Sequence, residues 1–230
     1  IFASVTKIMG IINLTPDSFY EPSRYDLSIL DSDADIVDIG AVSSRPGASE
    51  VPLEEEWRRL EPFLRALHTD KEISIDTTRS EIVRRAYGIV GPFIVNDISS
   101  GEDDPRMLET VASLGLGYVA MSRNADPFSY FEHHRFDGLD WILDPGFGFN
   151  KDSEQNVAIL SRLEELKAYG RPLLVGVADK RFTRAYPGGT EAVHLEALRK
   201  GADILRVHDV KKARQTVRLF EESFAEKTGD

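Results

Sequence analysis

The feature that most constrains the fold of this chain is a set of eight short apolar runs separated by segments of mixed polarity. Most of these runs do not alternate between apolar and polar residues, which is typical of parallel strands that are buried on both faces. We therefore expect eight parallel strands, at Lys7–Asn13, Ile36–Gly40, Ile73–Asp76, Phe93–Asp97, Gly117–Met121, Trp141–Asp144, Leu173–Val177 and Ile204–Val207.

The segments between these runs have the character of helices. Leu53–His68 carries apolar residues at helical spacing among charges, and Pro105–Leu114 follows two aspartates, with its proline in the first turn. The other expected helices are Arg79–Tyr87, Ser153–Tyr169, Thr190–Arg199 and Lys211–Phe224, with two weaker ones at Tyr25–Leu30 and Pro127–His134.

Eight strand–helix repeats predict an α/β protein with a (β/α)8 TIM barrel and some shortened outer helices. A doubly wound open sheet is the alternative. The chain has 230 residues, somewhat below the usual barrel size of about 250. No linker rich in Pro, Gly or Ser divides it, so we expect one domain over residues 1–230.

The composition excludes several classes of function. The 28 basic and 39 acidic residues give a net charge of −11, whereas a general nucleic-acid binder needs a basic face. Much of the acid, such as Glu54-Glu55-Glu56, is expected on the solvated outer helices. The absence of Cys excludes a disulfide scaffold, a Cys-ligated metal and a thiol nucleophile.

No window of the sequence is long and apolar enough for a membrane-spanning helix, and we expect no membrane partner. The first residues lack the pattern of a secretory signal. Because the first residue is not Met, we expect a chain trimmed at this end, with the cytoplasm as the default location.

Polar residues gather where the expected strands end, which is the face of a barrel that carries the active site. They are Asn13, Asp38, Asp76, Asn96, Asp97, Asp144, Asp179, Lys180, Arg206, His208 and Asp209. Any one of them alone is more simply explained as a helix cap or a turn residue. The same bias at seven strand ends favours a functional site. Arg206 also interrupts an apolar run, where an unpaired buried charge would be costly.

These residue types indicate a class of ligand. The side chains of Asp76, Asn96 and Asp144 suit a flat heterocycle with amino and ring N–H donors. The cations Arg45, Lys180, Arg206 and His208 suit a phosphate or a carboxylate. The pairing predicts a ligand with a polar aromatic head and an anionic tail.

Two further features lie outside the polar strand ends: a pair of phenylalanines in a turn and a pair of adjacent histidines. Phe147 and Phe149, in a Gly-rich turn, either wall an aromatic ring or pack beneath the loop. The adjacent pair His133-His134 lies in a polar segment and is interpreted as surface, because neighbouring residues of a helix point apart.

Seven motifs, in order along nearly the whole chain, closely resemble those of the dihydropteroate synthases. They are Met9-Gly10-Ile11-Ile12-Asn13-Leu14-Thr15-Pro16-Asp17-Ser18-Phe19, Val37-Asp38-Ile39-Gly40 with Ser43-Ser44-Arg45-Pro46-Gly47-Ala48, Ile75-Asp76-Thr77, Asn96-Asp97-Ile98-Ser99, Leu143-Asp144-Pro145-Gly146-Phe147-Gly148-Phe149, Leu174-Val175-Gly176-Val177 with Lys180, and Arg206-Val207-His208-Asp209-Val210.

The resemblance implies a barrel of the pterin-binding superfamily and a transferase of folate biosynthesis. The implied reaction joins (7,8-dihydropterin-6-yl)methyl diphosphate to 4-aminobenzoate by a dissociative substitution, giving 7,8-dihydropteroate and diphosphate. It also implies a Mg²⁺ ion on the diphosphate and a homodimer formed through the late helices.

Carried over by position, the resemblance implies roles for the matching residues. Asp76, Asn96 and Asp144 hold the pterin ring, with Lys180 against it, and Asn13 lies at the Mg²⁺. Arg45, Arg206 and His208 bind the diphosphate, and Asp38 belongs to the substrate-binding set. Asp17 and Phe19 lie in a first mobile loop. Ser44, Arg45 and Pro46 lie in a second, which closes the aminobenzoate pocket with Phe149. The residues expected to act in catalysis are Asp76, Lys180, Arg206 and His208.

The sequence departs from the family pattern at Asp179, Arg181 and Ser122, which stand where the family usually has Arg, Ser and His. Two alternatives therefore stay open: a non-catalytic or altered pterin-binding paralogue, and a pterin-binding methyltransferase domain. The second has no need of the Ser-Ser-Arg-Pro-Gly and Arg-Val-His motifs.

Overall fold

Eight parallel strands form the centre of the molecule. The computed structural model describes residues 6–14, 27–42, 50–134, 136–177, 181–184 and 186–225. The strands are β1 (Lys7–Asn13), β2 (Ile36–Gly40), β3 (Glu72–Asp76), β4 (Ile94–Asp97), β5 (Gly117–Met121), β6 (Asp140–Asp144), β7 (Leu174–Val175) and β8 (Ile204–Val207). Their order around the sheet follows the chain, with β8 paired to both β1 and β7.

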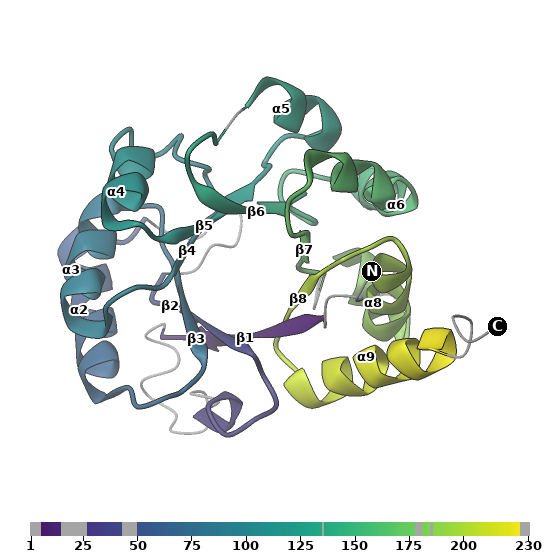
Figure 1. Cartoon of the computed structure of the whole chain (residues 1–230), viewed down its shortest axis with the longest axis horizontal. Helices are drawn as coiled ribbons and strands as arrows, with labels where there is room; N and C mark the ends of the chain where they lie inside the picture. Colours follow the sequence, from purple (N-terminus) through teal and green to yellow (C-terminus); the bar gives the residue numbers. More distant parts are fainter. Residues whose placement is uncertain are drawn as a thin grey trace.

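The sheet closes into a barrel between β6 and β7. A parallel bridge joins Leu143 to Leu173, and the amide of Leu143 donates to the carbonyl of Pro172 at 2.9 Å. Viewed along its axis, the barrel lies inside a ring of helices (Figure 1). The predicted (β/α)8 barrel is confirmed, and the open doubly wound sheet is wrong.

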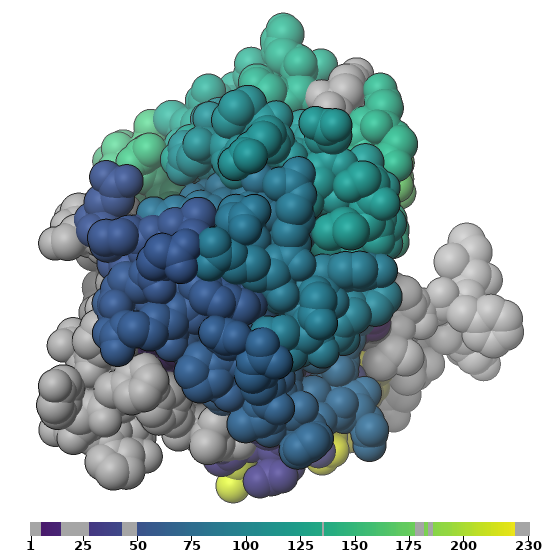
Figure 2. Space-filling view, turned by 90° about the vertical axis from the view of Figure 1, so that its left-hand side faces the viewer, coloured from purple at the N-terminus to yellow at the C-terminus, as the bar shows by residue number. Residues whose placement is uncertain are grey.

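The outer layer is formed by helices that follow the strands. They are α2 (Leu53–Ala66), α3 (Ser80–Val90), α4 (Met107–Leu114), α5 (Pro127–His133), α6 (Ser153–Ser161), α7 (Arg181–Arg184), α8 (Gly189–Arg199) and α9 (Val210–Ala225), with 3-10 helices η1 (Leu27–Ile29) and η2 (Leu163–Tyr169). Figure 2 shows the side of the molecule on which α2, α3 and α4 form the surface.

Two expected elements differ from the structure. The helix expected over Ser153–Tyr169 divides after Ser161, and its second part is η2. Leu163 and Leu166 are the buried residues of η2, and their three-residue spacing matches the period of a 3-10 helix. The strand expected over Leu173–Val177 pairs with β8 only at Leu174 and Val175 and adds the single bridge at Leu173, so it is shorter than predicted.

The barrel has separate apolar cores inside and outside the sheet. A small inner cluster holds Met9, Ile36, Ile94, Val119, Leu174 and Ile204, with Ile142 against it. A larger cluster fills the space between the strands and the helices. Successive side chains of a strand point to opposite faces, so each strand supplies residues to both cores.

The four even-numbered strands show how the inner core gives way to a polar site. Their inward isoleucines are Ile36, Ile94, Ile142 and Ile204. Two residues later, on the same face, come Asp38, Asn96, Asp144 and Arg206. Alternate strands of a barrel place their inward side chains in one layer. The interior therefore changes from an isoleucine layer to a polar layer toward the carboxyl ends of the strands.

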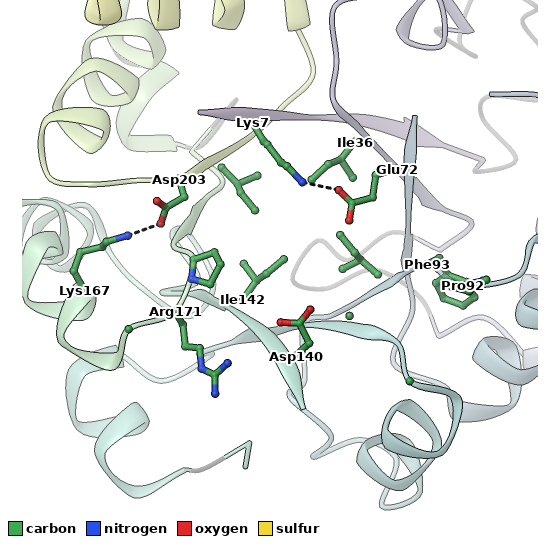
Figure 3. A pocket seen from close by; sticks show the side chains of 16 residues that line it. Lys7, Ile36, Glu72, Pro92, Phe93, Asp140, Ile142, Lys167, Arg171 and Asp203 are labelled. Atoms are coloured by element: carbon green, nitrogen blue, oxygen red, sulfur yellow. Dashed lines mark hydrogen bonds and ion pairs between the residues drawn. The ribbon is translucent and has the colours of Figure 1, made fainter. Parts of the chain in front are cut away.

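The opposite end of the barrel holds a cavity of about 780 Å³ (Figure 3). Inner isoleucines line it, including Ile36 and Ile142, and ion pairs of Lys7 with Glu72 and of Lys167 with Asp203 lie on its rim. Lys7, Ile36 and Glu72 begin their strands, Asp203 directly precedes β8, and Lys167 lies on η2. The cavity is therefore separated from the polar layer by the apolar interior.

One expectation about the acidic surface is wrong. Glu54 and Glu55 lie on the outer side of α2 in ion pairs with arginines, but Glu56 is only 3% exposed. Glu56, Leu60 and Leu64 are the buried residues of this helix. Their four-residue spacing places Glu56 on the helix face that packs against the barrel.

In the described ranges, no helix is long and apolar enough to cross a membrane. His133 and His134 are both exposed, as the sequence predicted.

The inner isoleucine layer is expected to stabilise the barrel without taking part in the site. Ile36→Ala should lower the free energy of unfolding by about 2–5 kcal/mol, because it removes buried methyl groups and leaves a cavity. The matched Ile36→Val variant should cost only about 0.5–1.5 kcal/mol. Urea unfolding measures both, and equal effects of the two variants would contradict the packing described for this layer.

Candidate functional site

Arg206 lies at the centre of the polar layer. Its Nε donates to Oδ2 of Asp38 at 2.7 Å, and its Nη2 donates to Oδ2 of Asp76 at 3.1 Å. The side chain is 20% exposed, and Nη1 makes no hydrogen bond with a residue in the described part of the chain. The sequence indicated that this charge needs a partner, and the structure supplies two.

The charge on Arg206 is maintained by these carboxylates. Burial lowers the pKa of the guanidinium, but the fields of Asp38 and Asp76 and the hydrogen bond to Asp38 outweigh burial, and the net pKa is raised. Arg206 thus stays cationic inside the barrel. One cation facing two carboxylates leaves the cluster with room for a further positive charge or a proton.

The excess of negative charge in this cluster affects the pKa of Asp76. This pKa is raised to about 7, chiefly by burial; Arg206 opposes this shift, and the carboxylates of Asp38, Glu56 and Asp97 add to it. Gly40 on the neighbouring strand makes space for this side chain, because a Cβ at Gly40 would lie 3.3 Å from the Cβ of Asp76. Asp76 is therefore a group that changes its charge near neutral pH.

Asp38 lies in the same layer as Arg206 and is fully buried. Its Oδ1 accepts from Oγ of Ser74 at 2.6 Å, and its Oδ2 accepts from Nδ2 of Asn96 at 3.0 Å. The sequence analysis did not single out Ser74. Its position two residues before Asp76, on the same strand face, is the signal that would have placed it inside the barrel.

Asp144 is held by the glycine-rich turn that follows β6. Its Oδ1 accepts from the backbone amide of Gly146 at 2.7 Å, and Asp144 as a whole is 7% exposed. Gly146 has φ of +70°, and a Cβ there would lie 2.1 Å from the carbonyl oxygen of Ser122. Glycine is required for this approach of two loops.

Lys151 joins the same two loops. Its Nζ donates to the carbonyl oxygens of Ser122, Gly146 and Phe149, at 2.9, 3.0 and 3.1 Å. Ser122, where the family usually has His, is fully buried at the point where the two loops meet. A charge-assisted set of three bonds fixes the turn that positions Asp144 and Phe149.

The two phenylalanines of the turn have different surroundings. Phe147 is buried in the outer core, with its ring 6.2 Å from that of Phe182, so it packs beneath the loop and does not wall a ligand. Phe149 is half-buried. For Phe149 the predicted role stays a prediction.

Two predicted site residues lie exposed at the rim. Asn13 ends β1 and His208 follows β8, and these two strands are neighbours in the barrel. Both are therefore on the same side of the mouth as Arg206. The remaining predicted residues fall outside the described residues: Asp17, Phe19, Ser44, Arg45, Pro46 and Lys180, together with the departure Asp179.

Asp97 does not belong to the site. It is fully buried and accepts hydrogen bonds from Ser99, Gly101 and the hydroxyl of Tyr118 at 2.7–2.8 Å. Burial raises its pKa in spite of these donors. Asp97 therefore stabilises the turn after β4, which is the structural role that a single aspartate after a strand most often has.

A buried network behind β3 was missed in the sequence. Glu56 on α2 accepts from Oγ1 of Thr77 at 2.7 Å and from Nη1 of Arg79 at 2.6 Å. Arg79 also donates to the carbonyl oxygen of Val51, just before α2. The network fixes the residues directly after Asp76, and it links them to the chain that enters α2.

Together, the described residues can bind a polar aromatic ligand. Carboxylate and amide oxygens of Asp144, Asp76 and Asn96 accept from N–H groups, and Arg206 donates from Nη1. No cluster of His, Cys, Asp and Glu fit to hold a metal by itself is found in the described ranges.

Comparisons with known proteins agree with this geometry. The family model described as "Pterin binding enzyme" matches residues 9–140 and 129–208. The dihydropteroate synthase of Synechocystis sp. is 35% identical, over 93% of this chain and 89% of the relative. The folic acid synthesis protein fol1 of Pneumocystis carinii is 37% identical over 91% of this chain, which spans only 35% of that longer protein.

A solved structure is also similar. The dihydropteroate synthase of Xanthomonas albilineans, determined with 4-aminobenzoic acid, superimposes with a TM-score of 0.87 at 32% identity. The match covers 96% of this chain and 93% of that one.

The Glu56 network is expected to contribute strongly to stability. Glu56→Ala should lower the free energy of unfolding by about 3–5 kcal/mol, because it leaves Arg79 and Thr77 without their buried partner. The neighbouring Glu54→Ala is the matched control and should leave stability close to wild type, since the side chain of Glu54 is exposed. Chemical unfolding measures both, and a similar result for the two variants would exclude a special role for Glu56.

The pKa of Asp76 predicts a pH dependence. Its value rises from an ordinary 3.8 to about 7 in the folded protein. Between these values the folded state keeps a proton that the unfolded state releases, so the contribution of Asp76 to stability is lost as the pH rises. Asp76→Asn should remove this dependence, and wild type should lose stability relative to the variant between pH 4 and 7.

Urea unfolding of wild type and Asp76→Asn across this pH range tests the expectation. Asp31→Asn, at an exposed position, is the control. Parallel stability curves for wild type and Asp76→Asn would show that the pKa of Asp76 is not raised.

Proposed function

Because the chain belongs to the dihydropteroate synthase family, we propose that it joins (7,8-dihydropterin-6-yl)methyl diphosphate to 4-aminobenzoate, forming 7,8-dihydropteroate and diphosphate. One observation carries this proposal: the guanidinium of Arg206 on β8 is bonded to Asp38 on β2 and Asp76 on β3, in the polar end of the barrel that also holds Asn96 on β4 and Asp144 on β6. This arrangement matches a ligand with N–H donors at one end and anionic groups at the other.

The acceptors suit the pterin ring. Its amino group and ring N–H donate in fixed directions within one plane, and Asn96 and Asp144 present oxygens from β4 and β6, on either side of β5. Asp76 adds a carboxyl group that is able to change its protonation near neutral pH. In the proposed role, Lys180 lies against the same ring.

The reaction is a substitution at the pterin methylene carbon. The C–O bond to diphosphate breaks, and its electron pair leaves with the diphosphate. The positive charge on the methylene spreads over the pterin ring, where the carboxylates of Asp38, Asp76 and Asp144 stabilise it electrostatically. The amine nitrogen of 4-aminobenzoate then forms the new C–N bond and releases one proton to water.

The protein supplies positioning and charge in this scheme. The nucleophile is the substrate amine, so no side-chain nucleophile is needed, and the chain contains no Cys. Nη1 of Arg206 is available to the departing diphosphate, with His208 and Arg45 proposed beside it. Ser44, Pro46 and Phe149 are proposed to close over the aminobenzoate, with Asp17 and Phe19 in the other loop.

The residues present fit a Mg²⁺ ion that is shared with the substrate. Mg²⁺ is commonly bound by one or two protein oxygens together with substrate phosphates and water. Asn13 offers an exposed carboxamide oxygen on the side of the mouth where β1 adjoins β8. When bound there, the ion would neutralise charge that develops on the diphosphate.

Assembly as a homodimer and a location in the cytoplasm remain predictions of the resemblance and of the sequence. The mass of the purified protein in solution tests the first, and the position of the full-length protein in cell fractions tests the second.

The activity is tested with purified protein, Mg²⁺, the pterin diphosphate and radiolabelled 4-aminobenzoate. Labelled 7,8-dihydropteroate is the expected product. Binding of the pterin without product would favour the altered pterin-binding paralogue, for which Asp179 and Arg181 give a specific reason. Transfer of a methyl group to a corrinoid would favour the methyltransferase.

Two variants should separate binding from turnover. Arg206→Lys is expected to lower kcat by roughly 100-fold, because a lysine ammonium cannot bond both carboxylates and still face the leaving group. Asp144→Asn is expected to act chiefly on KM for the pterin, since it replaces an acceptor of the ring N–H groups. Steady-state kinetics measures both, and wild-type constants in either variant would contradict the role assigned to that residue.

A further inference from the structure

Asp38 uses its hydrogen-bonding capacity within the protein. It is fully buried and accepts from Ser74, Asn96 and Arg206, which reach it from β3, β4 and β8. A carboxylate has no hydrogen to donate, so each of these bonds has a fixed direction. Asp38 is fully buried, whereas the side chain of Arg206 is 20% exposed, so it is Arg206 and not Asp38 that is accessible from the mouth.

The first consequence concerns the amide of Asn96. Its Nδ2 has to face Asp38, because Oδ2 of Asp38 only accepts. The opposite atom of the amide, Oδ1, is then directed away from Asp38. Without this carboxylate the amide would be free to turn over and present a donor in place of an acceptor.

The second consequence concerns Arg206. Nε of Arg206 bonds Asp38 and Nη2 bonds Asp76, so the plane of the guanidinium is set by two carboxylates on different strands. Nη1, the third nitrogen of the guanidinium, takes no part in these two bonds. Removing Asp38 would leave one partner and permit the guanidinium to rotate toward Asp76.

We propose that Asp38 is a positioning residue that does not touch the substrate: it fixes the amide of Asn96 as an acceptor and the guanidinium of Arg206 as a donor at the same mouth. This inference rests on the proposed function, and it replaces substrate binding as the role of Asp38. The carboxylate of Asp38 thus couples Asn96, which recognises the heterocycle, to Arg206, which faces the anionic group.

The first test does not depend on catalysis. In ligand-free wild type, the side-chain Nδ2 protons of Asn96 are expected to exchange slowly with solvent, and the Asn96→Ala variant identifies their NMR signal. Asp38→Ala should abolish this protection. Ser74→Ala is the matched control, because it removes the bond to the other oxygen of Asp38 and leaves the bond to Asn96 in place.

The second test measures coupling. Calorimetry with (7,8-dihydropterin-6-yl)methyl diphosphate, without aminobenzoate, is expected to show binding weakened roughly tenfold in Asp38→Ala. In the Asn96→Ala background, the same substitution should have a much smaller effect, since the amide that it positions is gone. Asp38→Asn keeps one acceptor oxygen and should recover part of the affinity.

The outcomes are distinct. Protected Asn96 protons that are lost in Asp38→Ala, together with non-additive binding, support the proposal. Unchanged protection in Asp38→Ala, or additive losses in the double variant, overturns it. If Asp38→Ala does not fold, Asp38→Asn is used for the binding cycle. If wild type binds no pterin, the proposed function fails, and the NMR measurement still decides the role of Asp38.

Discussion

The polar site depends on the ion-pair cluster in which Arg206 faces Asp38 and Asp76 inside the barrel. A buried charge is costly unless it is paired and hydrogen-bonded, and the two carboxylates pair with the guanidinium of Arg206. Ser74 and Asn96 complete the remaining bonds of Asp38. The cluster joins four strands, so its geometry is fixed by the barrel and in turn sets what the mouth presents to a ligand.

The barrel forms this cluster because the inward side chains of its even-numbered strands change from apolar to polar toward the carboxyl ends. On the even strands an isoleucine fills the interior and a polar residue follows on the same face, as Ile36 precedes Asp38 and Ile204 precedes Arg206. The apolar layer excludes water from one side of the charges and strengthens their interaction. Stability and chemistry are therefore supplied by adjacent layers of the same strands, and the loops need only close the mouth.

The family resemblance and the strand pattern predicted much of this architecture. Strand positions were correct because buried parallel strands leave an unmistakable apolar run, and polar residues at their ends were correctly expected to converge. Glu56 was assigned to the surface because it stands beside Glu54 and Glu55, although its spacing from Leu60 and Leu64 places it inward. Phe147 was left with two possible roles, since a turn does not reveal which aromatic points into the core.

The sequence by itself determined the barrel, the end of it that carries the site, and the residue types gathered there, because strand periodicity and the alternation of faces are local properties of the chain. Only the tertiary structure decided which groups pair. Asp38 and Arg206 are 168 positions apart, and their contact arises from closure of the barrel. Closure also left Asp38 without exposure and gave Asp76 a raised pKa, because both depend on charges and burial contributed by other strands.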